Sequence, residues 1–245
     1  MFDVPSPTLI GVIHLAPLPG NPRHTLPIEE IIIRAIADGR VLKEAGFDAA
    51  IVENYGDAPF SPDALPPASL AAMAVAADHL RRETRLRIGI NALRNDALAA
   101  LGIASATGAA FIRVNVHTGV YATDQGIIEG RADETLRYRK LIGACIAIFA
   151  DVAVKHARPL SEPDIARAAR DAAYRGLADA LIVTGPATGE PADLDELRRV
   201  AAAVPDRRVF VGSGATVESV AELLTVASGV IVGTGIKQGR RTENP

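Results

Sequence analysis

The sequence predicts the α/β class, and within it a (β/α)₈ TIM barrel that forms a single domain over residues 1–245. Three observations support this prediction. Short β-branched runs alternate with segments of helical period along the chain, which is typical of repeated βα units. The length of 245 residues is close to that of an ordinary barrel of this kind. The last two runs each end in a glycine-rich turn, at the place where such barrels frequently bind phosphate.

Composition excludes several classes of function. The net charge of −3, from 26 basic and 29 acidic residues, provides no basic field, so we expect no nucleic-acid partner. No apolar run reaches the roughly 18 residues of a membrane span, so we expect no transmembrane segment. The single cysteine, Cys145, fits a reducing compartment, and we expect a cytoplasmic protein. This cysteine lies in LIGACIAIFA, which we interpret as part of a helix with the thiol in the core.

Glycine and proline turns divide the chain into alternating strands and helices. We expect strands at 8–14, 48–54, 86–91, 110–116, 150–155 and 178–184, and within the stretches 209–216 and 229–237. We expect helices at 27–45, 68–82, 96–107, 162–175 and 194–203, with a further one after 117–130. The segment 117–130 has no clear pattern and carries three glycines, so we expect it to be a lid. No eighth helix follows the last strand, so we expect the final helix to be missing or truncated, with the groove covered in a homo-oligomer.

The alternation of side chains within the strands predicts a polar barrel interior. A barrel strand is buried on both faces, so polar residues that alternate with β-branched ones must point into the barrel. In the fourth strand, Ile112, Val114 and Val116 should face the helices, which turns Phe111 and Asn115 inward. The same argument for the neighbouring strands gives an inward polar cluster of Glu53, Asn91, Arg113, Asn115 and Lys155.

This cluster has a structural and a functional interpretation. As a structural network it would plug the barrel with buried cations, paired with Glu53 as the obvious anion. As a site it would keep one cation facing a ligand. Lys155 could then form a Schiff base or stabilise an oxyanion as a fixed ammonium, and borohydride trapping distinguishes these roles. We favour the ammonium because a neighbouring carboxylate keeps an amine charged.

The two glycine-rich turns are the expected phosphate site. Glycines allow close approach of backbone N–H groups to an anion, and a following helix start adds its positive dipole. The residues in question are Gly212, Ser213, Gly214, Gly233, Thr234 and Gly235. The alternative is that each glycine pair only makes a tight turn between strand and helix.

Three histidines stand at or just past expected strand ends and are candidates for general acid or base. They are His14, His117 and His156. His14 is the strongest candidate, because the first strand of a barrel adjoins the last and so its phosphate turn. No HxH pair marks a metal centre, and we assign no certain cofactor. A Mg²⁺ ion held by Glu53, Asp57 or Asp124 together with a phosphate stays an alternative.

Eight stretches, in chain order, resemble those of a known family. They are GVIHLAPLPGNP, VENYGDAPF, GINALRNDALAA, FIRVNVHTGVYATDQGIIEGRADETLRYR, VKHARPL, IVTGPATG, VGSG and VGTGIK. On these motifs the chain resembles the BtpA family over nearly its whole length. The resemblance implies a TIM barrel without established catalytic residues. It also implies a link to photosystem I biogenesis for some members, and sugar or nucleoside chemistry for SgcQ-like members.

Motif positions extend the candidate site beyond the inward cluster. The added loop residues are Asn54, Asp57, Arg94, Asn95, Asp124 and Thr184. Some of these have structural alternatives, because Asp96 suits the N-cap of a helix and its two neighbours can be ordinary loop polars. Asp57 can likewise serve only a turn.

We therefore expect an enzyme acting on a small phosphorylated metabolite, with lyase, isomerase or aldolase-type proton chemistry at a carbonyl. Cleavage of a nucleoside or glycoside is the second enzymatic choice. The alternative from another class is a non-catalytic assembly factor that uses the barrel as a scaffold. A scaffold has no need of a polar barrel mouth and two glycine turns, so the enzyme is the preferred interpretation.

Overall fold

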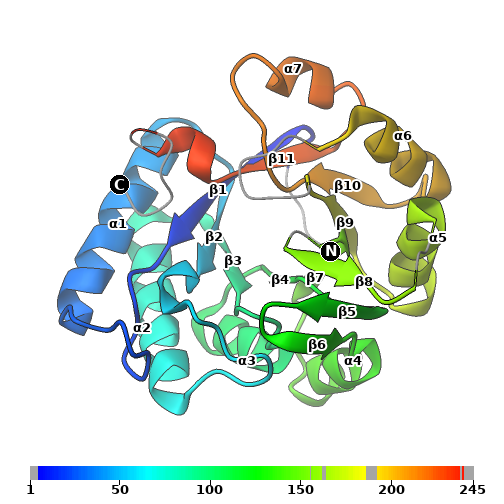
Figure 1. Ribbon diagram of the computed structural model, residues 1–245. Helices are drawn as coiled ribbons and strands as arrows, with labels where there is room; N and C mark the ends of the chain where they lie inside the picture. Colours follow the sequence, from blue (N-terminus) through cyan, green and yellow to red (C-terminus); the bar gives the residue numbers. More distant parts are fainter. Residues whose placement is uncertain (1–4, 155, 162–163, 186–191, 238, 240–245) are drawn as a thin grey trace.

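The computed structural model describes residues 5–154, 156–161, 164–185, 192–237 and 239. Its centre is a closed barrel of parallel strands in the order β1-β11-β10-β9-β7-β4-β3-β2 (Figure 1). The barrel strands are β1 (Thr8–His14), β2 (Ala49–Glu53), β3 (Arg87–Asn91), β4 (Phe111–Val114), β7 (Ala147–Ala153), β9 (Ala180–Val183), β10 (Arg208–Val211) and β11 (Gly229–Val232). The predicted TIM barrel is confirmed.

Helices surround this barrel (Figure 1). They are α1 (Ile28–Glu44), α2 (Pro67–Thr84), α3 (Ala97–Thr107), α4 (Ala132–Leu141), α5 (Ile165–Arg170), α6 (Leu194–Ala203) and α7 (Val220–Leu223), and α5 continues as the π-turn η2 (Asp171–Arg175). Local sequence sets their ends: Asp96 accepts the Ala99 N–H to begin α3, and Gly108 ends it with a φ of 72°. Within the described residues, no helix combines the length and the apolar character needed to cross a lipid bilayer.

The strand ring closes within one chain. β1 pairs in parallel with β11, from Thr8 opposite Gly229 to Gly11 opposite Val232. After β11 the described chain makes the 3₁₀ turn η3 (Thr234–Ile236), and the Lys237 ammonium then pairs with Asp38 on α1. The strands therefore need no second chain to close, while the expected cover over the groove stays a prediction.

The lower half of the barrel is packed with aromatic rings. Phe111 stacks on Phe149 with centroids 4.6 Å apart, and Phe149 lies 5.0 Å from Phe210. On the other side of β4, Ile112 and Val114 belong to the core formed with the helices. The predicted directions of Phe111, Ile112 and Val114 are thus confirmed, and the polar residues of the strand lie above the aromatic rings.

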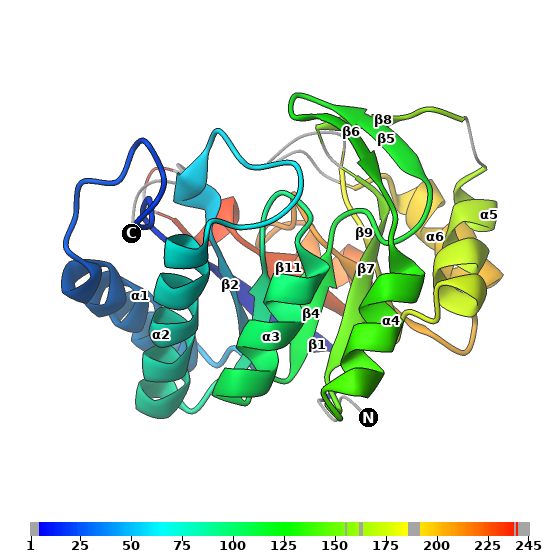
Figure 2. The same ribbon diagram turned by 90° about the horizontal axis from the view of Figure 1, so that it is seen from below.

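The segment 117–130 differs from the expected unpatterned lid. It forms a hairpin of β5 (Val120–Thr123) and β6 (Gly126–Glu129), and β5 also pairs with β8 (Ala157–Pro159). Figure 2 shows this small sheet above one side of the barrel. Tyr121 and Ile128 are buried with Val116 and Val154, so Val116 does not pack on the helices as expected. Strands of four residues are too short for their alternation to stand out in the sequence.

The helix expected around Cys145 is also wrong. Helix α4 ends at Leu141, Gly143 turns the chain with a φ of 64°, and β7 begins at Ala147. Cys145 is therefore exposed in a loop instead of buried in a helix. A continuous apolar run fits a buried strand as well as a helix, and here the glycine in the left-handed region marks the boundary.

Candidate functional site

Three polar residues end three neighbouring strands in a single row. His14 of β1 lies opposite Glu53 of β2, which lies opposite Asn91 of β3. The Asn91 amide donates a hydrogen bond of 2.6 Å to Glu53 Oε2, and His14 Nε2 lies 3.9 Å from Glu53 Oε1. The Tyr55 ring contacts the His14 ring edge-on at 5.1 Å. The row places a carboxylate and an imidazole side by side at the barrel mouth.

A second polar group lies on the next two strands. Arg113 of β4 donates from Nε and Nη2 to the two carboxylate oxygens of Asp151 on β7, at 3.0 Å each. Asn115 donates to the same carboxylate at 3.1 Å. Burial alone would lower the pKa of the Arg113 guanidinium, but the charges of Asp151 and Glu53 and the Asp151 hydrogen bonds outweigh it, so this pKa is raised.

The anion expected for Arg113 was Glu53, and this assignment is corrected by the structure. Asp151 is the ion-pair partner, because β7 adjoins β4 and Asp151 is the next residue on the same face of β7 after Phe149, which lies opposite Arg113. Sequence reasoning gave Asp151 no role. The signal was present: a buried guanidinium requires a carboxylate, and the adjacent strand supplied one on its inward face.

Arg94 brings another cation to the mouth, from the loop after β3. Its side chain is buried and lines the cavity described below. Burial lowers the pKa of this guanidinium, opposed by the charges of Asp151, Asp124 and Glu53. Arg94 thus lies in the field of Asp151 and Glu53, the carboxylates that also act on Arg113.

The two glycine turns adjoin these groups from the other side of the barrel. A Cβ built at Gly233 would lie 3.2 Å from His14 Cε1, so the turn after β11 runs along the imidazole. A Cβ at Gly212 would lie 2.7 Å from Thr184 Cγ2 and 3.3 Å from Arg113 Nη2. The turn after β10 therefore starts beside the buried guanidinium.

The remaining residues of these turns are tied to one another. Ser213 Oγ accepts the Gly185 N–H at 2.8 Å, which joins the turn after β10 to the one after β9. Gly214 has a φ of 70°, which few residues other than glycine adopt. A Cβ at Gly235 would lie 3.1 Å from the Ala215 carbonyl oxygen, so the two turns pack together. Thr234 begins the short η3 turn.

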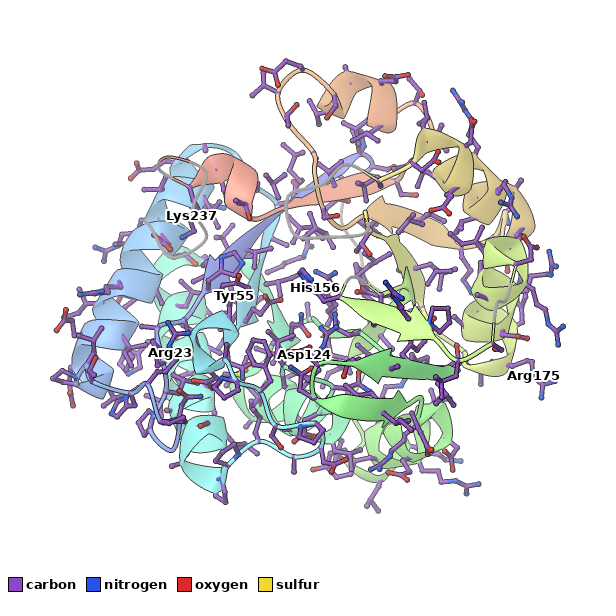
Figure 3. The ribbon with its side chains drawn as sticks, in the orientation of Figure 1. Arg23, Tyr55, Asp124, His156, Arg175 and Lys237 are labelled. Atoms are coloured by element: carbon purple, nitrogen blue, oxygen red, sulfur yellow. The ribbon has the colours of Figure 1, made fainter. Side chains whose placement is uncertain are left out.

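A cavity of about 780 Å³ opens at this end of the barrel. Its polar lining includes His14, Arg23, Arg94, Asp124, His156 and Lys237. One wall is apolar and includes Leu15, Leu26, Ile31 and Phe60. Figure 3 shows Tyr55, Asp124 and His156 around the opening, with Asp124 carried by the small hairpin sheet. The volume lies within the range of ordinary small-molecule sites.

Three of the expected loop residues hold the scaffold together. The Asn95 amide exchanges two hydrogen bonds with the backbone of Val116, at 2.9 and 2.8 Å, and lies outside the cavity. Asn54 accepts the Leu93 N–H and donates to Asp57. Asp57 accepts the Leu18 N–H at 2.7 Å; burial raises the pKa of its carboxyl, opposed by these hydrogen bonds.

The site expected from the sequence is therefore only partly brought together. The mouth gathers His14, Glu53, Asn91, Arg94, Arg113, Asn115, Asp124 and His156. Lys155 lies outside the described residues. Sequence reasoning missed Tyr55, Arg23 and Lys237, which belong to loops where no alternation reveals a direction. Among the described residues, no group of three His, Cys, Asp or Glu side chains is arranged to hold a metal ion.

His117 belongs to a different cavity, between the hairpin sheet and α5. This cavity has a volume of about 710 Å³ and is also lined by Tyr121, Arg167 and Arg175. Figure 3 shows Arg175 on the outer side of the molecule, away from the mouth. His117 is buried and its Nε2 bonds the Gly176 carbonyl oxygen at 2.8 Å. Burial lowers the pKa of its imidazole, so the neutral ring is favoured.

Comparison with known proteins gives a family and a fold. The model of the BtpA family matches residues 6–245. The photosystem I biogenesis protein BtpA of Synechocystis sp. is 47% identical over 230 residues, which cover 94% of this chain and 80% of that protein. The family match begins before β1 and ends after η3, so it includes every described element.

Solved structures with the same fold are far more distant in sequence. N-acetylmannosamine-6-phosphate 2-epimerase from Clostridium perfringens superposes with a TM-score of 0.61 at 15% identity, covering 98% of this chain and 91% of that one. Orotidine 5'-phosphate decarboxylase from Pyrococcus horikoshii gives 0.59 at 17% identity, covering 96% and 93%. Both are similar to this chain in the architecture of the barrel.

Proposed function

Because the chain belongs to the BtpA family, whose barrel here carries a polar mouth, we propose that it is an enzyme acting on a small phosphorylated metabolite. The substrate is a sugar phosphate or a nucleotide, and the reaction is of the lyase, isomerase or aldolase type, with proton transfer next to a carbonyl. One observation carries the proposal: the His14–Glu53 pair lies directly against the glycine turn after β11.

The turns after β10 and β11 supply the phosphate site. They follow the last two strands of the ring, the position where barrels of this kind frequently hold a phosphate, and they pack against each other. Solved structures of the same fold include enzymes named for phosphorylated substrates. The fold alone does not specify a reaction, so this likeness supports the substrate class and not the chemistry.

His14 and Glu53 supply the proton chemistry. A carboxylate 3.9 Å from the imidazole orients it and stabilises its protonated form, as general acid–base catalysis requires. Arg94 in the cavity wall then stabilises the negative charge that develops on a carbonyl oxygen when a neighbouring carbon loses its proton. The ammonium of Lys155 is expected from the sequence to act in the same way.

Solvent deuterium exchange tests this proposal. We would incubate the protein with sugar phosphates and nucleotides in deuterium oxide and follow loss of carbon-bound protons by NMR. The His14→Asn and Glu53→Gln variants should each slow exchange at least about 100-fold, the usual contribution of a general acid or base. The matched control is His79→Asn on the exposed face of α2, which should exchange like the wild type. Equal rates in all variants would contradict the assignment.

A second candidate function is assembly of a larger complex without catalysis. It is favoured by one observation, the 47% identity to a protein named for photosystem I biogenesis. If this is the function, His14→Asn should support photosystem I biogenesis in Synechocystis cells that lack the relative as well as the wild type does. Failure of that variant alone would favour the enzyme.

A further inference from the structure

Two asparagines at the barrel mouth share an unusual arrangement. Asn91 ends β3 and Asn115 follows β4, and each residue is only 1% exposed. Each amide nitrogen donates to a carboxylate, Glu53 in one case and Asp151 in the other. Each amide oxygen is buried and has no hydrogen-bond partner among the described residues.

The orientation of both amides is fixed by chemistry. An ionised carboxylate only accepts hydrogen bonds, so the NH₂ group of each asparagine must face it. Rotating either amide by 180° would set an oxygen against a carboxylate oxygen. The two Oδ1 atoms are therefore acceptors held in place, and a buried acceptor without a donor costs stability.

The surroundings define what donor they require. The nearby described charges are three carboxylates, Glu53, Asp151 and Asp124, and the guanidinium groups of Arg94 and Arg113. An amide oxygen carries no formal charge, and the Asp151 carboxylate beside Asn115 is already paired with Arg113, so neither oxygen requires a charged donor. A neutral donor such as a hydroxyl satisfies them without adding an unpaired charge.

The two oxygens also occupy different heights in the barrel. Gly89 and Ile90 lie opposite Phe111 and Ile112, and continuing this register places Arg113 beside Asn91. Asn115 is the next residue on the same face, about 7 Å nearer the mouth. Donors that reach both must be carried on different carbon atoms of one molecule.

From this arrangement we infer that Asn91 and Asn115 form a hydroxyl-binding subsite, and that the phosphorylated substrate is a polyol, such as a sugar or the sugar part of a nucleotide. The inference rests on the proposed function. The two asparagines are then specificity-determining residues that select hydroxylated over unhydroxylated phosphates, rather than groups that exchange protons.

The experiment compares two probes that differ only in hydroxyl groups. D-ribose 5-phosphate and tetrahydrofurfuryl phosphate share the five-membered ring and the phosphate, and inorganic phosphate serves as the reference. Calorimetric titration of the wild type should give ribose 5-phosphate an affinity about tenfold higher, the effect of hydrogen bonds to neutral acceptors. In Asn91→Leu and Asn115→Leu this ratio should fall toward one, while the affinity for inorganic phosphate stays unchanged.

Each other outcome has a definite meaning. If the leucine variants do not fold, Asn91→Ala and Asn115→Ala replace them, since the smaller side chain demands no extra space. A wild type that binds both probes equally, or variants that keep the preference, overturn the subsite while leaving the phosphate site standing. A preference that disappears with EDTA identifies the oxygens as cation ligands and also overturns it. Absence of binding to every phosphate, inorganic phosphate included, contradicts the proposed function, and the subsite falls with it.

Discussion

Arg113 and Asp151 form a bidentate ion pair inside the barrel, with both hydrogen bonds at 3.0 Å and side chains that are 2% and 0% exposed. Removing one partner leaves the other as an uncompensated buried charge. We therefore expect Asp151→Asn to lower the free energy of unfolding by about 3–5 kcal/mol. Urea denaturation followed by circular dichroism measures this change.

The matched control replaces both members of the pair. The double variant Arg113→Met with Asp151→Leu removes both charges and keeps most of the volume, so it should be more stable than either single replacement. A double variant whose loss equals the sum of the two single losses would show that the two side chains do not depend on one another.

The free energy of unfolding should decrease as the pH is lowered, because of His117. Burial lowers the pKa of this imidazole below its ordinary value of 6.5. In the unfolded chain the imidazole of His117 has its ordinary pKa near 6.5. Below neutral pH the unfolded state therefore binds a proton more readily than the folded state does. Stability contributed by the neutral ring is therefore present above that pKa and is lost as the pH falls, by up to about 1.4 kcal/mol per pH unit.

Urea denaturation at pH 7.5 and pH 5.5 measures this effect in the wild type and in His117→Gln. Glutamine can still donate a hydrogen bond to the Gly176 carbonyl oxygen but does not titrate in this range. The wild type should lose more stability between the two pH values than the variant. Identical losses would show that His117 does not set the pH dependence.

Replacement by alanine should change stability in opposite directions at two helical glycines, Gly102 and Gly39. A Cβ at Gly102 in α3 meets only Tyr138 Oη, at 3.7 Å, so Gly102→Ala should stabilise by about 0.5–1 kcal/mol through helix propensity. A Cβ at Gly39 in α1 would lie 2.4 Å from Leu80 Cδ1. Gly39→Ala should therefore destabilise by about 1–3 kcal/mol through overpacking against α2. Thermal unfolding of both variants checks the pair, and a change of the same sign in both would refute this account of the packing.

The sequence was sufficient to predict the barrel and the inward direction of the polar residues on its strands. Alternation in 110–116 identified Arg113 and Asn115 as inward, because a strand buried on both faces has few other uses for polar side chains. The sequence was insufficient to predict which of these side chains form ion pairs. Which carboxylate meets Arg113 depends on strand order and register, and the neighbour of β4 is fixed only when the ring closes.

The loops were the part that the sequence predicted least well. Asn54, Asp57 and Asn95 have the composition of ligand-binding residues, yet each is used in hydrogen bonds that join one loop to another. Lys237 lines the cavity through its pairing with α1, a contact between segments 199 residues apart. Such contacts produce no periodicity in the sequence. The sequence therefore shows which residues a loop contains but not how they are arranged.

The phosphate site is the central claim, and calorimetric titration of inorganic phosphate into the wild type, Gly214→Asp and Gly214→Asn tests it most directly. Asparagine and aspartate both tolerate the φ of 70° found at Gly214 and have the same shape, so the two variants differ only in charge. The account predicts binding by the wild type, retained binding in Gly214→Asn and at least about tenfold weaker binding in Gly214→Asp, through repulsion of the anion. A wild type that binds no phosphate, or two variants that bind it equally, would contradict the account.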